Sequence, residues 1–410
     1  MKKKSNCFFY RCYCRLRQFI YKNAAKFLSW RIPVIIGGCR CMKQVSNILA
    51  QKKIGSVLLI TDRTVYGLGM TAELETELAE RGIQCFVYKE TAQNPTIENA
   101  EEAVAAFREN RCGAIIACGG GSAIDCAKAA GARAARPEKK LVQMAGVQKV
   151  RKPPPLLFAI PTTAGTGSET TLAAVITDGA NRRKFAINDI CLIPHYAVLA
   201  PALTVTLPKS VTAATGMDAL THAVEAYIGR GNTKQTKRDA ERAFVLIKRS
   251  LQKAYENGGD IEARMDMLNA AHYAGRAFTR AYVGNVHAAA HTLSGFYGVP
   301  HGLANAVLLP VVLEYYGRAV YKKLARIAAV MEIGSGSDAA EERAKKLIAY
   351  IRELNAKINI PDKISDIRRE DLPRMAEYAF REANPLYPVP VIFGRRDFEN
   401  IFNNTNSLLL

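Results

Sequence analysis

The sequence predicts two domains of different class: an α/β domain built on a parallel sheet, followed by an all-helical domain. Before about residue 210, short apolar and β-branched runs alternate with helical patterns, and after it only helical patterns remain. The chain has 410 residues, of which 49% are hydrophobic and 23% charged, so it can form two well-cored domains. We predict an N-terminal extension over residues 1–30, the α/β domain over 31–209 and the helical domain over 210–410.

Four apolar runs bounded by turn residues predict the strands of the α/β domain. They are GSVLLITD (55–62), IQCFVYKE (83–90), CGAIIACGGG (112–121) and PLLFAIPTT (155–163). The segments TAELETELAERG (71–82) and TIENAEEAVAAFREN (96–110) lie between strands and have helical periodicity. Such alternation is typical of strand–helix–strand units, which is why we expect a parallel sheet.

Two of these strands lead into loops rich in glycine and hydroxyl residues, within residues 119–129 and 161–169. Glycines let the backbone approach a phosphate, and we expect Ser122 to cap a helix whose free N–H groups favour an anion. Asp125 could have a purely structural role instead of a role in cofactor binding, because it could close a capping box with Ser122. One glycine triplet is a weak signal, but two loops at strand ends of one sheet favour a nucleotide site. The spacing is not GxGxxG, and the acidic candidate for a ribose, Asp62, precedes the glycines, so an ordinary Rossmann unit fits poorly.

The second half carries four long segments with helical periodicity: residues 239–257, 261–278, 339–358 and 369–384. Residues 281–313 contain no charged side chain, which raises the question of a membrane span. Three histidines, two asparagines and two prolines interrupt this run. We therefore expect a buried helix, a turn and a second helix there.

Histidines are concentrated in one stretch of the helical domain. Three of the six histidines of the chain fall in VHAAAHTLSGFYGVPHG (286–302). His287 and His291 are four residues apart and share one helical face, and His301 follows a turn that could fold it back toward them. Asp218 and His222 in TGMDALTHAVEAY form a second pair with this spacing.

A single histidine in such a helix is more often a hydrogen-bonded core residue than a ligand. The two pairs with a further histidine, in a histidine-poor chain, instead favour a metal site. One carboxylate with three or four imidazoles suits Zn²⁺ or Fe²⁺ and leaves a position for substrate. A zincin protease is excluded, because Ala288 stands where the HExxH motif needs its glutamate.

Four motifs in this order resemble the iron-containing (group III) alcohol dehydrogenases: GGGSAIDCAKA, PTTAGTGSE, TGMDALTHAVEAY and HAAAHTLSGFYGVPHGLANAVLLP. The resemblance covers nearly the whole chain from about residue 31. It implies a dinucleotide-binding α/β domain, a helical metal domain, an active site in the cleft between them, and hydride transfer between a small primary alcohol or aldehyde and NAD(P).

The resemblance also assigns roles to residues. The implied metal ligands are Asp218, His222, His287 and His301, whereas His291 resembles the non-ligand histidine beside the nicotinamide and substrate. The implied cofactor contacts are Gly119, Gly120, Gly121, Ser122, Asn94, Asp125, Thr162, Thr163, Thr171 and Lys184. Asp62 ends a strand where a carboxylate would bind both ribose hydroxyls and repel a 2′-phosphate, so we expect NAD rather than NADP. The expected metal is Fe²⁺, although the same ligands also suit Zn²⁺.

The net charge of +20 is concentrated at the N-terminus. Residues 1–61 hold thirteen Lys and Arg and no Asp or Glu. In the extension, basic residues alternate with aromatic and aliphatic ones. This pattern fits either a segment packed on the rest of the protein with its basic face in solvent, or weak contact with an anionic surface. No small-residue cleavage site follows an apolar core there, so we expect a cytoplasmic protein with reduced cysteines and no specific nucleic-acid partner.

Two other function classes remain open at this point. A dehydroquinate synthase-like or glycerol dehydrogenase-like enzyme of the same fold would also bind NAD and a metal, but a phosphorylated substrate should require more convergent Lys and Arg. The other alternative is a basic, nonenzymatic binding protein. For the enzyme we expect a homo-oligomer, such as a dimer.

Overall fold

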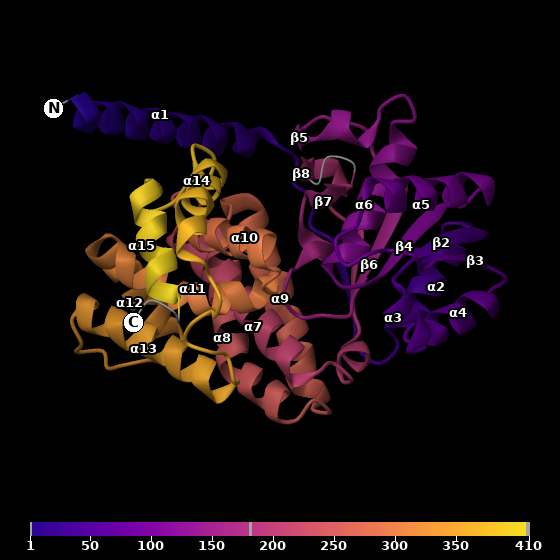
Figure 1. The fold of residues 1–410 in the computed structure, drawn as a ribbon. Coiled ribbons are helices and arrows are strands. Elements are labelled where there is room, and N and C mark those ends of the chain that lie inside the picture. The colour runs from indigo at the N-terminus through magenta and orange to yellow at the C-terminus, as the bar shows by residue number, and fades with distance from the viewer. Residues whose placement is uncertain (1, 180–182, 407–410) are drawn as a thin grey trace. The chain divides into compact units, whose positions relative to one another are not determined.

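The computed structural model describes residues 2–179 and 183–406, which fall into two compact units (Figure 1). One unit is Ser29–Thr206, and the other joins the chain up to Leu28 with Leu207 onward. The first has the α/β class expected from the sequence, and the second is helical. Both predicted fold classes are therefore confirmed.

A six-stranded parallel sheet forms the centre of the α/β unit. The strand order is β1-β9-β6-β4-β2-β3, and each neighbouring pair is parallel. The strands are β1 (Val34–Gly37), β2 (Ser56–Ile60), β3 (Gln84–Tyr88), β4 (Ala114–Gly119), β6 (Leu156–Pro161) and β9 (Tyr196–Leu199). Because β6, β4 and β2 are adjacent and parallel, the loops after their carboxyl ends meet at one edge of the sheet.

Side chains of the sheet alternate between two apolar cores, as the two-residue period of a strand requires. Leu58, Ile115 and Leu157 face one core, which α5 (Ile97–Glu109) and α6 (Gly121–Ala135) cover. Leu59 and Ile116 face the other core, against α2 (Cys41–Gln51) and α4 (Ala72–Ala79). Figure 1 shows these helix pairs on opposite faces of the sheet, with the short α3 (Arg63–Gly67) beside α4.

Several strands were not predicted from the sequence. A small second sheet has the order β5-β8-β7, formed by β5 (Gly146–Val147), β7 (Ala173–Asp178) and β8 (Arg183–Asn188). Strands β1 and β9 of the main sheet have only four residues each. Runs this short, or with charged residues as in β8, give no clear two-residue alternation from which to predict a strand.

The helical unit contains nine α-helices after residue 207 in the described chain, together with the N-terminal α1 (Lys2–Ala24). The nine are α7 (Lys209–Ile228), α8 (Lys234–Glu256), α9 (Ile261–Ala281), α10 (Asn285–Tyr297), α11 (His301–Tyr316), α12 (Tyr321–Val330), α13 (Ala340–Lys357), α14 (Leu372–Ala383) and α15 (Arg395–Thr405). The uncharged run forms α10 and α11, the expected buried helix, turn and helix. None of the described helices combines the length and apolarity needed to cross a membrane.

Candidate metal centre and cofactor loops

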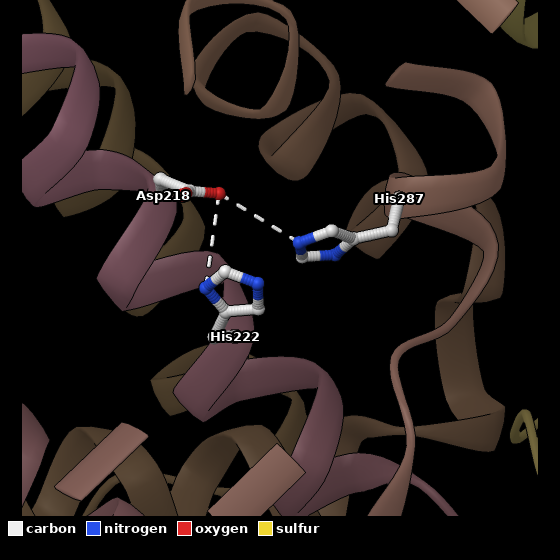
Figure 2. Close-up of side chains that lie close together, drawn as sticks. All are labelled: Asp218, His222 and His287. Atoms are coloured by element: carbon white, nitrogen blue, oxygen red, sulfur yellow. Dashed lines mark ion pairs between the residues drawn. The ribbon is translucent and has the colours of Figure 1, made fainter. Parts of the chain in front are cut away.

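Three helices of the helical unit bring the histidine-rich motifs together. Helix α7 carries Asp218 and His222 one turn apart, both buried. His287 projects from the first turn of α10, and His301 is the first residue of α11. Figure 2 shows Asp218, His222 and His287 converging on one point. Gly302 allows α11 to approach α7 closely, because a Cβ there would lie 2.3 Å from the carbonyl oxygen of Ala214.

The carboxylate of Asp218 is the centre of the cluster. Its Oδ1 lies 3.7 Å from Nδ1 of His222, 3.7 Å from Nε2 of His287 and 3.4 Å from Nε2 of His301. The ligand atoms that Asp218, His222 and His287 offer all lie within 4.8 Å of one another. One divalent ion with ligand bonds of about 2.0–2.2 Å fits between groups at this spacing.

Charge couples these groups strongly. Burial alone would raise the pKa of Asp218, but the imidazoles of His222, His301 and His287 outweigh it and hold that pKa well below its usual value. Burial disfavours protonated His287, yet the neighbouring carboxylates of Asp218 and Glu225 raise its pKa to about 9. For His301, partial burial together with repulsion from the neighbouring imidazoles outweighs the attraction of Asp218, and the pKa falls well below 6.5. A carboxylate that stays ionised in such a buried place is suited to a cation.

Glu225, which the sequence analysis did not single out, orients His287. Its Oε2 accepts hydrogen bonds from Nδ1 of His287 at 2.7 Å and from the backbone N–H of Gly284 at 2.7 Å, and its Oε1 accepts from the N–H of Val286 at 2.8 Å. A side chain at position 284 would collide with Glu225, since a Cβ there would lie 2.6 Å from Oε1. Glu225 thus caps the first turn of α10 and fixes the proton of His287 on Nδ1.

The environment of Nε2 of His287 shows whether the residues present fit a metal. Nε2 of His287 points toward Asp218, and this buried atom has no hydrogen-bond partner among the described residues. With the Nδ1 proton held by Glu225, Nε2 can give up its own proton and offer its lone pair to a cation. A buried nitrogen acceptor without a partner is costly unless an ion or another donor occupies the space. A metal therefore fits the residues present. Glu225 could have been found in the sequence, because positions 218, 222 and 225 lie on one helical face.

His301 lies beside the cluster and is partly exposed. Its ring centroid is 5.4 Å from that of His287. Asn305, one turn later on α11, donates from Nδ2 to Oδ1 of Asp218 at 2.8 Å and lies 3.1 Å from Nε2 of His301. Asn305 thereby holds the carboxylate and this imidazole at a fixed separation.

His291 has a different environment from His287, although both lie on α10. The side chain of His291 is 44% exposed, whereas that of His287 is 2% exposed. Nδ1 of His291 is 2.5 Å from Oε1 of Glu382, which also accepts a hydrogen bond from the hydroxyl of Tyr387 at 3.0 Å. The ring stacks against that of His301, with centroids 4.9 Å apart. Glu382 is a second partner that the sequence analysis missed, since it is 91 residues away from His291 along the chain.

In the α/β unit, the glycine loop after β4 forms the start of α6. Gly119 has a φ of +154°, and a Cβ there would lie 2.7 Å from the Cβ of Ala123 and 3.5 Å from Oδ2 of Asp62. Thr162, in the loop after β6, donates its N–H to the carbonyl oxygen of Gly119 at 3.0 Å. These three positions therefore meet at one edge of the sheet, with Thr163 packed near Gly120.

The expected cap of this helix was wrong. Gly120 is the N-cap of α6 and makes no side-chain cap hydrogen bond, whereas Ser122 lies inside the first turn and donates to the carbonyl oxygen of Gln93. The first N–H groups of α6 are thus left uncapped by side chains, as an anion-binding helix end requires.

Two other predicted cofactor contacts, Asp125 and Thr171, are hydrogen-bonded to neighbouring protein groups. Asp125 accepts from the hydroxyl of Ser168 at 2.7 Å and from the N–H of Val175 at 3.0 Å. Thr171 accepts from the fully buried Lys128 at 2.7 Å. These bonds tie α6 to the loop after β6 and to β7.

The remaining predicted cofactor contacts of the α/β unit are Asn94, Lys184 and Asp62. Lys184 donates to Oδ1 of Asn94 at 2.8 Å. Asp62 is the N-cap of α3, and its Oδ1 accepts from the N–H groups of Thr64 and Val65, both at 2.9 Å. Its second carboxylate oxygen faces Gly119.

Comparison with known proteins agrees with this geometry. Residues 33–201 match the family described as iron-containing alcohol dehydrogenase, and residues 212–405 match the C-terminal part of the Fe-containing alcohol dehydrogenase family. The chain belongs to the iron-containing alcohol dehydrogenase family. The resemblance identified from the four motifs is thereby confirmed.

Individual relatives match this chain over most of its length. It is 38% identical to the 1,3-propanediol dehydrogenase of Klebsiella pneumoniae over 374 residues, which are 90% of this chain and 94% of the relative. It is 35% identical to the NAD-dependent methanol dehydrogenase of Bacillus methanolicus, over 85% of this chain and 92% of the relative. The crystal structure of a 1,3-propanediol oxidoreductase superposes with a TM-score of 0.88 at 35% identity and covers 92% of this chain and 100% of its own.

Family membership establishes the class of activity. The protein is an oxidoreductase that acts on alcohols, as the sequence analysis predicted. A metal at Asp218, His222 and His287, together with NAD, fits this family. A nonenzymatic binding protein is thereby excluded as the main function.

Proposed function

We propose that the protein catalyses the reversible, NAD-linked oxidation of a small primary alcohol to its aldehyde, with a divalent ion held by Asp218, His222, His287 and His301. The cluster of Asp218 with three imidazoles supports this proposal most directly. The relatives described as 1,3-propanediol dehydrogenase and methanol dehydrogenase support short, unbranched alcohols as the substrate class.

The ion would be bound by one carboxylate oxygen and three imidazole nitrogens. A divalent ion at this position would lower the pKa of the alcohol and polarise the aldehyde carbonyl, while the nicotinamide would exchange the hydride. Asp218 supplies the only negative charge in this ligand set, and Glu225 and Asn305 hold the orientation of the groups around it. Fe²⁺ is the ion that the family name supports, and the same donors also accept Zn²⁺.

His291 is assigned a proton-transfer role. Glu382 accepts the Nδ1 proton, so the lone pair of Nε2 is free to receive the proton of the alcohol. The partly exposed ring can then pass this proton to water. Its stacking on His301 keeps it next to the metal cluster.

NAD is assigned to the loops of the α/β unit. The uncapped N-terminus of α6 and Gly119–Gly121 offer backbone N–H groups and close approach to the pyrophosphate. The free carboxylate oxygen of Asp62 would bind the ribose hydroxyls and repel a 2′-phosphate, which favours NAD over NADP. Lys184, with Asn94 holding its ammonium group, adds positive charge for the phosphates.

One experiment tests these assignments together. The purified protein is assayed with a panel of short alcohols and aldehydes, with NAD and with NADP, beside metal analysis of the same preparation. We expect about one Fe²⁺ or Zn²⁺ per chain, steady NADH formation from at least one primary alcohol, and a clear preference for NAD.

Two results would contradict the proposal. A metal-loaded protein that turns over no simple alcohol or aldehyde, but converts a phosphorylated or polyhydroxylated substrate, would favour the dehydroquinate synthase-like or glycerol dehydrogenase-like alternative. Full activity of the zinc form, with no gain when ferrous iron and a reductant are supplied, would overturn the choice of iron.

A further inference from the structure

Helix α1 (Lys2–Ala24) docks on the helical unit through one face. Cys14 is buried against Val389 and Ile392. Arg15 donates to the carbonyl oxygens of Val389 and Pro390 at 2.7 and 2.8 Å. Gln18, one turn later, donates to the carbonyl oxygen of Tyr387 at 2.7 Å. Because these bonds reach backbone atoms of residues 387–390, the orientation of α1 on this unit is fixed, as Figure 1 shows beside α14.

The opposite face of α1 is apolar and exposed. Phe9, Leu16, Phe19 and Ile20 are 67%, 59%, 66% and 51% exposed. Spacings of three, four and seven residues place them in one stripe along the helix. Phe8 and Tyr13 border this stripe, and Phe27, just beyond the helix, is also exposed. We name Phe9, Leu16, Phe19 and Ile20 the apolar stripe of α1.

The helix that carries the stripe is strongly basic and has no acidic residue. Helix α1 contains seven Lys and Arg and no Asp or Glu. Arg11 is exposed, and Arg17 lies over the rings of Tyr13 and Tyr21. Arg17 borders the stripe, whereas Arg11 has the spacing of the docked residues Cys14, Arg15 and Gln18.

A second basic cluster lies at the C-terminal end of α1. Burial and then repulsion from Lys26, Lys237 and Arg230 lower the pKa of Lys22. Burial, followed by repulsion from Lys237, Arg230, Lys22 and Arg15, lowers the pKa of Lys323 to about 8. Lys22 donates to the carbonyl oxygen of Arg230 at 2.7 Å and Lys323 to that of Ile228, so the two ammonium groups are held beside the end of α7. Such a gathering of positive charge favours an anionic partner.

We propose that α1 is an interfacial helix that binds the protein to a bilayer surface with anionic headgroups, its apolar stripe entering the acyl boundary and its net positive charge attracting the headgroups. An exposed Phe/Leu/Ile stripe on a helix rich in Lys and Arg is the pattern of such helices. The helix lies outside the residues that match the family, 33–201 and 212–405, and contributes no side chain to the metal cluster.

Two other occupants fit the surface less well. A second copy of this chain would bring two helices of the same high positive charge together at the stripe, which costs free energy. A nucleic acid could bind the Lys and Arg side chains and the aromatic rings of α1. The aliphatic side chains of Leu16 and Ile20, however, offer no stacking surface for nucleobases. Only a lipid surface uses both the aliphatic stripe and the positive charge.

Vesicle flotation of the full-length protein tests the proposal. Vesicles of phosphatidylcholine alone are compared with vesicles that also contain phosphatidylglycerol, at low and high salt. We expect binding to the anionic vesicles only, weakened by salt. Changing Leu16 and Phe19 together to Gln should weaken this binding at least roughly tenfold, because two large apolar groups no longer enter the membrane.

Matched variants separate this effect from general changes in surface. Leu68→Gln removes an apolar side chain that is 63% exposed on the α/β unit, and should leave binding unchanged. Arg11→Glu should weaken binding several-fold, whereas Arg369→Glu, with the same change in net charge, should not. Alcohol oxidation in solution should be the same in all four variants, since none changes a residue assigned to the metal centre or to the cofactor loops.

Three outcomes would overturn the proposal. The first is no flotation with anionic vesicles, or equal flotation with neutral ones. The second is retention on RNA that the Leu16/Phe19 variant keeps, together with weak vesicle binding, which would indicate a nucleic-acid partner. The third is a dimer in solution that dissociates in the Leu16/Phe19 variant while lipid binding is absent, which would assign the stripe to a second copy.

Discussion

The proposed metal centre is formed by side chains from α7, α10 and α11, whereas the proposed cofactor loops offer mainly backbone groups, and several of their side chains are bonded to other protein groups. Asp218 lies within 3.7 Å of three imidazole nitrogens. By contrast, Asp125 and Thr171 are held by Ser168, Val175 and Lys128. A substitution at the metal centre should therefore abolish metal binding or catalysis directly. A substitution at the cofactor loops should act by changing the conformation of the loop backbone.

The largest effect is expected from removing a ligand at the metal centre. His287→Ala leaves Asp218, His222 and His301 as an incomplete site, so the protein should lose its metal and its activity should fall to near background. Metal content and turnover of one preparation measure this. His272→Ala, at another buried histidine of the helical unit, is the matched control and should retain metal. A His287→Ala protein with full metal content would show that the ligands lie elsewhere.

A substitution of His291, beside the metal centre, should lower the rate of turnover without changing the metal content. His291→Ala should keep about one metal per chain and lose roughly 10²–10⁴-fold in turnover, the usual range for a missing proton-transfer group. Glu382→Gln should produce part of this loss, because the amide no longer fixes the proton on Nδ1. If His291→Ala purifies without metal, His291 is a ligand and the division of roles on α10 is wrong.

Much of the metal centre could be predicted because spacing on a helix determines which side chains share a face. Asp218 with His222 and His287 with His291 were found from a separation of four residues. The same rule could have identified Glu225. It could not separate His287 from His291, because their different exposure depends on how α10 packs against other helices.

The cofactor loops were harder to predict in detail. Sequence patterns located both loops and the strands before them, because glycines and hydroxyl residues cluster after apolar runs. They failed at Ser122, where the helix begins two residues earlier than a serine cap would place it. They also missed Lys128, since a lysine within a helix gives no sign that it will be buried with its ammonium group bonded to loop oxygens. Long-range contacts of this kind are set by tertiary packing.

A smaller effect is expected from weakening the support of a ligand. Glu225→Gln should lower metal affinity roughly 10–100-fold, because the neutral amide binds the Nδ1 proton of His287 less strongly. Excess metal should restore most of the activity, which distinguishes this variant from His287→Ala. Glu241→Gln changes a glutamate that accepts from Tyr227 in the same unit and should leave metal affinity unchanged. Loss of activity that excess metal does not restore would show that Glu225 acts beyond ligand orientation.

The smallest effect on activity is expected at His195 in the α/β unit, a histidine that holds two strands. Its Nδ1 accepts a hydrogen bond from the N–H of Leu157 at 3.1 Å, and burial, followed by repulsion from Arg31 and Lys52, lowers its pKa to about 4. The unfolded chain, with a pKa of about 6.5, binds this proton more readily. Stability from His195 is therefore complete above about pH 6.5 and is lost as the pH falls toward 4.

His195→Asn tests this role, because an amide oxygen can still accept from Leu157 but does not titrate. The variant should keep turnover within about twofold and lose less Tm than the parent protein between pH 6.5 and 4. His195→Leu removes the acceptor and should lower Tm at every pH, since a buried N–H is left without a partner. Parallel Tm profiles for the parent and His195→Asn would show that His195 does not titrate on unfolding. A loss of metal or turnover in either variant would instead extend the chemistry of the helical unit to a histidine of the α/β unit, against the contrast between the two regions.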